Sequence, residues 1–120
     1  MVALRKRQGK SAEDLAVQFL RKRGLTILQR NYRCRIGEID IIALDGDTLV
    51  FVEVRSRSSS RFGFPQDTVN FRKQQKCKRV AECYLVSRQK TASFCRFDVI
   101  GVLFDDNGRL QKIEHIMDAF

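Results

Sequence analysis

Hydrophobic and polar residues alternate with two different periods along this chain, and together they predict a mixed α/β domain. Residues 11–24 repeat apolar side chains at helical spacing, on a face made by Ala12, Leu15, Ala16, Phe19 and Leu20. Ser11, with Asp14 three residues on, is expected to cap this helix, and Gly24 is expected to end it. Residues 1–9 precede the helix and are expected to be flexible.

Apolar runs with strand-like alternation follow. Strands are expected at residues 25–33, 37–44, 48–56, 94–104 and 109–116. A second helix is expected over residues 67–86, with a core face of Val80, Ala81, Tyr84 and Leu85. Residues 55–65 are polar and rich in turn formers, and a mobile loop is expected over 56–64. The predicted order is α-β-β-β-α-β-β, in one domain spanning residues 1–120.

The second and third strands form a hairpin that carries charges within its apolar runs. Side chains alternate along a strand, so Glu53 and Arg55 project from the same face, opposite a valine-rich face. Asp45-Gly46-Asp47 supplies the turn. The register at this turn decides whether Asp40 joins them.

A two-residue loop would pair Leu44 with Asp47 and make Asp40 the diagonal neighbour of Glu53. A four-residue loop would pair Leu44 with Leu49 and place Asp40 directly opposite Glu53. A three-residue loop without a bulge would send the two carboxylates to opposite faces.

Two carboxylates on one partly buried face repel each other and need a cation or a shared proton. Mg²⁺ and Mn²⁺ prefer oxygen ligands and often combine one or two carboxylates with substrate phosphate. Asp40, Glu53 and Arg55 therefore make chemical sense as a phosphodiester hydrolysis site. The plainer interpretation is an ion-pair network on a solvent-facing side of the hairpin.

The charge of the chain favours a polyanionic partner. With 23 Lys and Arg against 14 Asp and Glu, the formal net charge is +9. Nucleic acid is the expected partner. No apolar stretch approaches the roughly 20 residues that span a bilayer, and no secretory signal is evident, so a cytoplasmic protein without membrane association is expected.

Several other chemistries lack their residues. The four cysteines form no C-x-x-C pair and are expected to be free, partly buried thiols, and His115 is the single histidine. A zinc site and histidine-assisted nucleophilic catalysis are therefore not expected, and His115 is interpreted as a surface residue at a strand end. Phosphate-cradling and dinucleotide-binding glycine motifs are also missing from the sequence.

The segment GEIDIIALDGDTLVFVEVRSR, with RNYR before it and KQQK, RFDVI and DAF after it, resembles the YraN-like family of predicted endonucleases. That family is placed in the PD-(D/E)XK nuclease superfamily and is related in fold to archaeal Holliday junction resolvases. The resemblance runs nearly the whole chain. It implies a restriction-endonuclease-like fold, a central mixed sheet flanked by helices, and a DNA endonuclease that uses Mg²⁺ or Mn²⁺.

Carried over residue by residue, the resemblance makes Asp40 and Glu53 the metal ligands. Arg55 stands where the superfamily has Lys; because Arg stays protonated, it can stabilise charge or hold a phosphate but is a poor general base. Glu13 matches a catalytic acid on the first helix, or is simply an exposed first-turn glutamate. Glu38 and Asp98 are expected to pair with nearby arginines.

Substrate contacts are expected from a set of basic and polar residues: Lys73, Gln74, Lys76, Arg33, Arg57 and Arg61. Each basic residue could equally be part of a solvated face. Phe62, Phe64 and Tyr32 could stack on bases or anchor loops. Structure-selective cutting of branched DNA and a homodimer rest on the resemblance alone. The alternative function is a nucleic-acid-binding protein that keeps the nuclease fold without hydrolysis, which Arg55 favours.

Overall fold

The computed structural model describes residues 2–58, 65–88 and 94–120. These residues form, in order, α1 (Val2–Lys22), β1 (Thr26–Arg33), β2 (Glu38–Asp45), β3 (Thr48–Ser58), the short 3₁₀ helix η1 (Pro65–Thr68), α2 (Phe71–Ser87), β4 (Phe94–Phe104) and β5 (Leu110–Ile116). The predicted order of α-helices and strands is confirmed.

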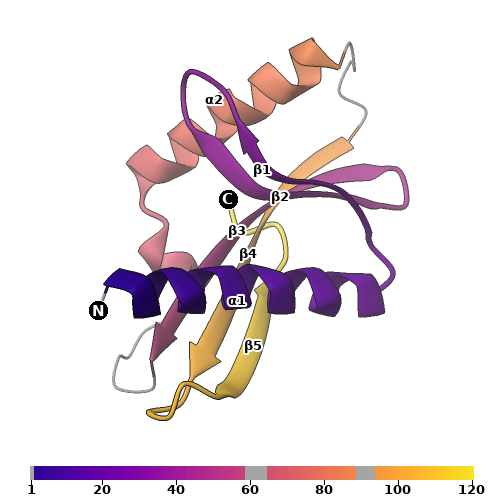
Figure 1. Ribbon diagram of the computed structural model, residues 1–120. Coiled ribbons are helices and arrows are strands. Elements are labelled where there is room, and N and C mark those ends of the chain that lie inside the picture. The colour runs from indigo at the N-terminus through magenta and orange to yellow at the C-terminus, as the bar shows by residue number, and fades with distance from the viewer. Residues whose placement is uncertain (1, 59–64, 89–93) are drawn as a thin grey trace.

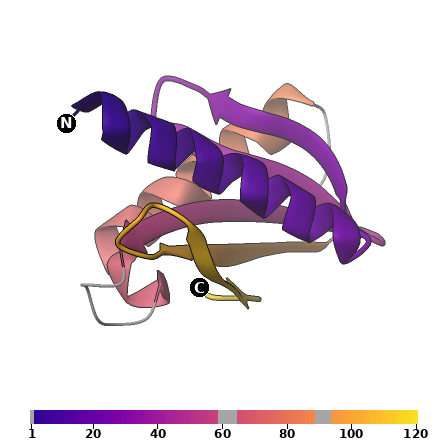
Figure 2. The ribbon, with the colours of Figure 1, turned by 60° about the horizontal axis from the view of Figure 1, so that its bottom comes forward.

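The strands of the described residues form one mixed sheet in the order β1-β2-β3-β4-β5. Within the described residues, β3 and β4 are the only parallel neighbours, and the other neighbouring strands are antiparallel. A parallel pair needs a crossover connection, and here the crossover contains α2. The two α-helices cover opposite faces of the sheet, as Figures 1 and 2 show.

Helix α1 packs through the predicted apolar stripe, in which Ala12, Ala16 and Leu20 are fully buried. It begins at Val2, however, so Ser11 lies inside the helix and is not its cap. The preceding residues are mostly good helix formers, which the capping pattern at Ser11 obscured. Gly24 ends the helix as predicted: its φ is +91°, and the Leu25 N–H donates to the Leu20 carbonyl at 3.0 Å.

Helix α2 begins at Phe71, four residues after the predicted start. The side chain of Asn70 accepts a hydrogen bond from the Lys73 N–H at 2.9 Å and caps the helix. Pro65–Thr68 forms η1 instead of the first α-helical turn. Val80, Ala81 and Tyr84 are buried against the sheet, as the periodicity predicted.

The β2–β3 hairpin pairs Asp45 with Thr48 and Leu44 with Leu49. This is the register expected for the four-residue loop, although only Gly46 and Asp47 lie outside the paired residues. Gly46 has a φ of +59°, which glycine adopts without strain. Val50 and Val52 are buried against α1, so the face with Phe51 and Glu53 is directed towards α2.

Strand β3 continues to Ser58, so residues 56–58 are strand and not the expected loop. Their pairing with β4, which runs from Thr48↔Phe94 to Ser58↔Phe104, explains the difference. Residues 59–64 of the expected loop lie outside the described residues.

A buried polar network joins β4 and β5. Asp98 is fully buried, accepts from Arg96 Nε at 3.0 Å, and lies 2.7 Å from His115 Nε2. The pairing of Asp98 with an arginine confirms its expected structural role. The interpretation of His115 as a surface residue is wrong, because its side chain is only 2% exposed and is buried against Asp98.

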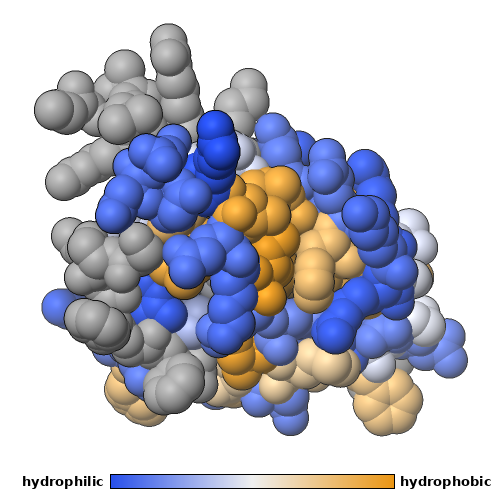
Figure 3. Space-filling view, turned by 90° about the horizontal axis from the view of Figure 1, so that it is seen from below, coloured by the Kyte–Doolittle hydropathy of each residue, from blue (hydrophilic) through white to orange (hydrophobic). Residues whose placement is uncertain are grey.

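Figure 3 views the molecule from below and shows hydrophobic surface in the middle of this face, surrounded by hydrophilic side chains. Among the described residues, no helix combines the length and the apolar character needed to cross a membrane.

Candidate functional site

Asp40 lies where β2 stops pairing with β3. The paired residues end at Ile41↔Val52, and Asp40 and Glu53 are the next residues along the two strands. Beyond this pair, a side chain of β2 accepts a hydrogen bond from the backbone of β3: Asp40 Oδ2 accepts from the Val54 N–H at 2.8 Å. This bond fixes the carboxylate at the strand end and leaves Oδ1 for another ligand.

Glu53 is buried, with only 5% of its surface exposed. Lys73 Nζ, from the first turn of α2, lies 3.8 Å from its Oε2, and the Cys77 thiol, one turn further along α2, is hydrogen bonded to it. Sequence reasoning missed Cys77, although its i+4 spacing from Lys73 places both on one helix face. The glutamate thus stands between the sheet and α2.

Burial and the nearby Asp40 carboxylate raise the pKa of Glu53 to about 7. Burial also raises the pKa of Asp40, while its hydrogen bond with the Val54 N–H and the charges of Lys73 and Arg55 oppose that shift. The Cys77 thiol, buried beside Glu53, has a pKa raised to about 12 and stays protonated. The two carboxylates therefore create a site that favours a bound cation or a proton.

Glu13 contributes to the same acidic field from α1. Burial and the Asp40 carboxylate raise the pKa of Glu13. The carboxylates of Glu13 on α1 and Asp40 on β2 therefore repel each other. The Glu13 side chain is only 22% exposed, and its buried Oε1 has no hydrogen-bond partner in the described residues; Arg30 Nη2 is 3.8 Å away. Glu13 is thus neither an exposed nor a first-turn residue of α1.

Arg55 lies two residues beyond Glu53 on the same strand. Its Nη2 donates to the Thr68 carbonyl in η1 at 3.4 Å, and its buried Nε has no partner among the described residues. The guanidinium lowers the pKa of both Asp40 and Glu53, so it lies within their electrostatic reach. It holds a fixed positive charge beside the carboxylate pair.

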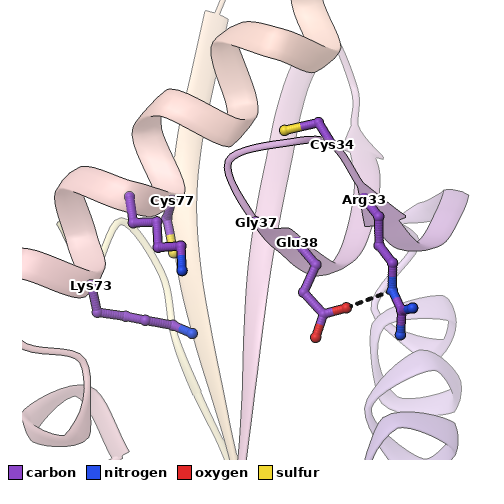
Figure 4. A pocket seen from close by; sticks show the side chains of 7 residues that line it. Arg33, Cys34, Gly37, Glu38, Lys73 and Cys77 are labelled. Atoms are coloured by element: carbon purple, nitrogen blue, oxygen red, sulfur yellow. Dashed lines mark hydrogen bonds and ion pairs between the residues drawn. The ribbon is translucent and has the colours of Figure 1, made fainter.

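A cavity of about 340 Å³ opens between the β1–β2 connection and α2. Figure 4 shows Lys73 and Cys77 lining it from α2, and Arg33, Cys34 and Glu38 from the other side. Arg33 is paired with Glu38 at 2.9 Å, which confirms the expected arginine partner of Glu38. Lys76 also lines the cavity, and its stem passes so close to Gly37 that a Cβ there would lie 2.8 Å from Lys76 Cε.

The structure distributes the remaining predicted contact residues differently. The Gln74 amide donates to the Val69 carbonyl at 3.0 Å, so it secures the segment before α2. Tyr32 packs edge-on against Tyr84, with ring centroids 5.2 Å apart, and anchors the β1 end. Arg57 is half-buried on β3, in the same alternation as Glu53 and Arg55. Arg61, Phe62 and Phe64 lie outside the described residues.

The donor set fits a hard divalent cation only in part. In the described ranges, no three His, Cys, Asp or Glu side chains are grouped closely enough to hold a metal. Asp40 and Glu53 offer two carboxylates, which suits ions that keep water and take substrate phosphate as further ligands. The cysteines do not compete with them: all four are free, and burial ranges from buried Cys77 to exposed Cys95.

Comparison with known proteins shows which protein family this chain resembles. The sequence model of the uncharacterised protein family UPF0102 matches residues 12–102. The chain belongs to the UPF0102 family. The match spans every site residue described above, from Glu13 on α1 to Cys77 on α2.

Individual UPF0102 proteins are similar along their whole length. The one from Pelotomaculum thermopropionicum is 46% identical over 120 residues, which is 100% of both chains. The one from Desulforamulus reducens is 48% identical over 117 residues, 96% of each chain. A third, from Dictyoglomus turgidum, is 42% identical over 112 residues, 93% of this chain and 95% of the other.

Proposed function

We propose that this UPF0102 protein is a metal-dependent endonuclease that hydrolyses phosphodiester bonds in DNA. The observation that carries the proposal is the pair Asp40 and Glu53: burial and the nearby Asp40 carboxylate raise the pKa of Glu53 to about 7, and Lys73 and Arg55 lie beside them. The net charge of +9 suits a polyanionic substrate.

The arrangement of the sheet and helices agrees with the restriction-endonuclease-like fold that the PD-(D/E)XK resemblance implies, and we include that fold in the proposal. Structure-selective cutting of branched DNA would follow from the relationship to junction resolvases. A cytoplasmic location, where free thiols persist, completes it.

In this proposal the carboxylates of Asp40 and Glu53 would hold Mg²⁺ or Mn²⁺. The ion would supply Lewis acidity and activate water. Displacement of Lys73 from Glu53 frees its ammonium group, 3.8 Å away in the described state, to bind the phosphate or to orient the attacking water. Arg55 stabilises negative charge as it develops on the phosphate and does not accept the proton.

Wild type, Asp40→Asn and Glu53→Gln should be compared for cutting of branched, nicked and single-stranded DNA with Mg²⁺ or Mn²⁺. The wild type should cut, and each variant should lose about 10²-fold or more in rate, because one neutral ligand weakens the ion and its water. Glu114→Gln, a carboxylate paired with Lys112 on β5, is the matched control and should cut normally. Equal rates in wild type and Asp40→Asn would reject the proposal.

The second candidate is binding without hydrolysis. The Glu53–Lys73 contact favours it, because an internal cation already offsets part of the buried charge without a metal. This function predicts salt-dependent DNA binding and no product with any divalent ion. Asp40→Asn would then bind DNA more tightly, since one source of repulsion is removed.

A further inference from the structure

Two larger cavities lie along α2 beside the 340 Å³ cavity that Lys73 and Cys77 line. One of about 630 Å³ shares Lys73 and Lys76 with it. The other, of about 730 Å³, shares Cys34 with it, and both larger cavities are lined by Ile36 and Arg79. The three cavities are therefore neighbours, and the surface that they share along residues 33–36 and α2 is here named the α2 groove.

The α2 groove is basic. Arg35, Arg72, Lys76 and Arg79 line it and are exposed. None of these four forms an ion pair within the described ranges, in contrast to Arg30, Arg33 and Arg96, each of which is paired with a carboxylate. Glu82 adds one acidic side chain to the lining of the 730 Å³ cavity. Unpaired cations in a row are suited to successive phosphates.

An aromatic ring accompanies these cations. Phe71, the first residue of α2, is 72% exposed and lines the groove together with Ile36. Base stacking on an exposed aromatic side chain needs an unpaired base, since bases within a duplex are already stacked. Cations and one free aromatic ring together fit a single strand better than a duplex.

We propose that the α2 groove binds a single-stranded stretch of nucleic acid that continues from the candidate site. Its phosphates contact Lys76, Arg79 and Arg72, and one of its bases stacks on Phe71. The inference rests on the proposed function, which places the cut bond at Asp40 and Glu53. The residues that would bind the single strand are other residues, on the α2 groove. The inference gives the site a substrate class: nucleic acid with an unpaired segment beside the bond that is cut.

The chain contains no tryptophan, so Phe71→Trp would introduce a single fluorescent reporter. It should be made in the Asp40→Asn background and titrated with oligothymidylate in the absence of divalent ions. Stacking should quench the emission of the introduced indole saturably. Phe94→Trp is the matched control: Phe94 is 68% exposed and begins β4, which follows the far end of α2, and its reporter should not respond. No quenching at position 71, or equal quenching at both positions, would overturn the proposal.

The cations are tested by the salt dependence of the same binding. An Arg72→Gln/Arg79→Gln double variant should reduce the slope of log affinity against log salt by about 1.4, which is two contacts at roughly 0.7 each. An Arg109→Gln/Lys112→Gln variant removes two charges from the β4–β5 side and should keep the slope. An unchanged slope in the first variant, or equally strong quenching by a duplex of the same length, would contradict the assignment.

This test separates the two proposals, because its readout needs neither a metal nor cleavage. Quenching at position 71 without any cleavage by the wild type would reject the endonuclease and retain the groove. Cleavage without quenching would retain the endonuclease and reject the groove.

Discussion

Glu53 is the carboxylate of the site whose ionisation is most unfavourable. It is buried and lies near Asp40, and among the described residues its ionic partner is the Lys73 ammonium, 3.8 Å away. A carboxylate in this position destabilises the fold when it is ionised without a cation. Binding a divalent ion would relieve that cost, which links the stability of the protein to its proposed chemistry.

The first prediction concerns the pH dependence of stability without metal. The pKa of Glu53 is raised from 4.5 to about 7, so the folded state keeps this proton between those values while the unfolded state loses it. Stability should therefore fall as pH rises from 4.5 to 7, by roughly 3 kcal/mol at most, and then level off. Urea unfolding at pH 5 and pH 8 measures this.

Glu53→Gln is the matched variant for that measurement. It should lose most of the decline and be more stable than wild type at pH 8. Adding Mg²⁺ at pH 8 should stabilise the wild type and leave Glu53→Gln nearly unchanged. Parallel pH curves for the two proteins would show that Glu53 does not carry the effect.

Arg55 gives a second prediction at this scale. Its role is a fixed positive charge beside the carboxylates, so Arg55→Lys should keep the rate of cutting within about 10-fold, while Arg55→Gln should lose about 10²-fold. Single-turnover rates across pH 6–9 would measure both. A fall in the rate at high pH that occurs only in Arg55→Lys would agree with a charge role, because lysine can lose its proton and arginine cannot. Equal rates in all three proteins would contradict a charge role.

Among the secondary-structure elements, η1 is the support of Arg55. The Thr68 carbonyl of η1 accepts its hydrogen bond, and Pro65 of η1 rests on Gly101 in β4, the strand partner of Arg55. A Cβ on Gly101 would lie 2.1 Å from Pro65 Cγ. The close packing of η1 on β4 therefore requires glycine at this position.

Gly101→Ala should displace η1 and with it the position of the Arg55 guanidinium. We expect a loss of about 1–3 kcal/mol in the free energy of unfolding and a lower cutting rate below the melting temperature. Gln111→Ala, an exposed position on β5, is the control for both measurements. Normal stability and activity in Gly101→Ala would show that η1 does not support the site.

The elements also show what the sequence could predict and what it could not. Strand alternation placed Glu53 and Arg55 together correctly, because period two leaves no freedom within a strand. The start of α2 was misplaced, because Asp67 and Asn70 are both good caps and only the packing of η1 on β4 selects Asn70. The Asp40 position depended on a turn register that several loops could satisfy.

At the scale of the whole molecule, the sheet separates two charged clusters. Glu53 lies two residues from Phe51 and shares its face of the sheet, towards α2. Asp98 lies two residues from Ile100 and shares the opposite face, towards α1. The Asp98 cluster is fully paired: burial opposes its ionisation, but hydrogen bonds with His115 and Arg96 lower the pKa of Asp98. Sequence reasoning missed the role of His115, because 17 residues separate it from Asp98 and only the β4–β5 pairing joins them.

Asp98→Asn should therefore damage the fold and spare the chemistry. Replacing this carboxylate with an amide leaves the buried His115 and the largely buried Arg96 without the negative charge that they share, at a cost of about 3 kcal/mol in unfolding free energy. Thermal denaturation and cutting assays well below the melting temperature would test it against Asp40→Asn, for which the opposite result is expected. A loss of activity in fully folded Asp98→Asn would place this cluster in the chemistry.

The central claim is that Asp40 and Glu53 share a divalent ion, and anomalous diffraction from a crystal soaked in Mn²⁺ at pH 8 tests it most directly. The predicted result is one peak within about 2.5 Å of an oxygen of each carboxylate, with Lys73 moved away from Glu53, and no peak in an Asp40→Asn crystal. A wild-type crystal without a peak at saturating Mn²⁺, in which Lys73 still contacts Glu53, would contradict the claim.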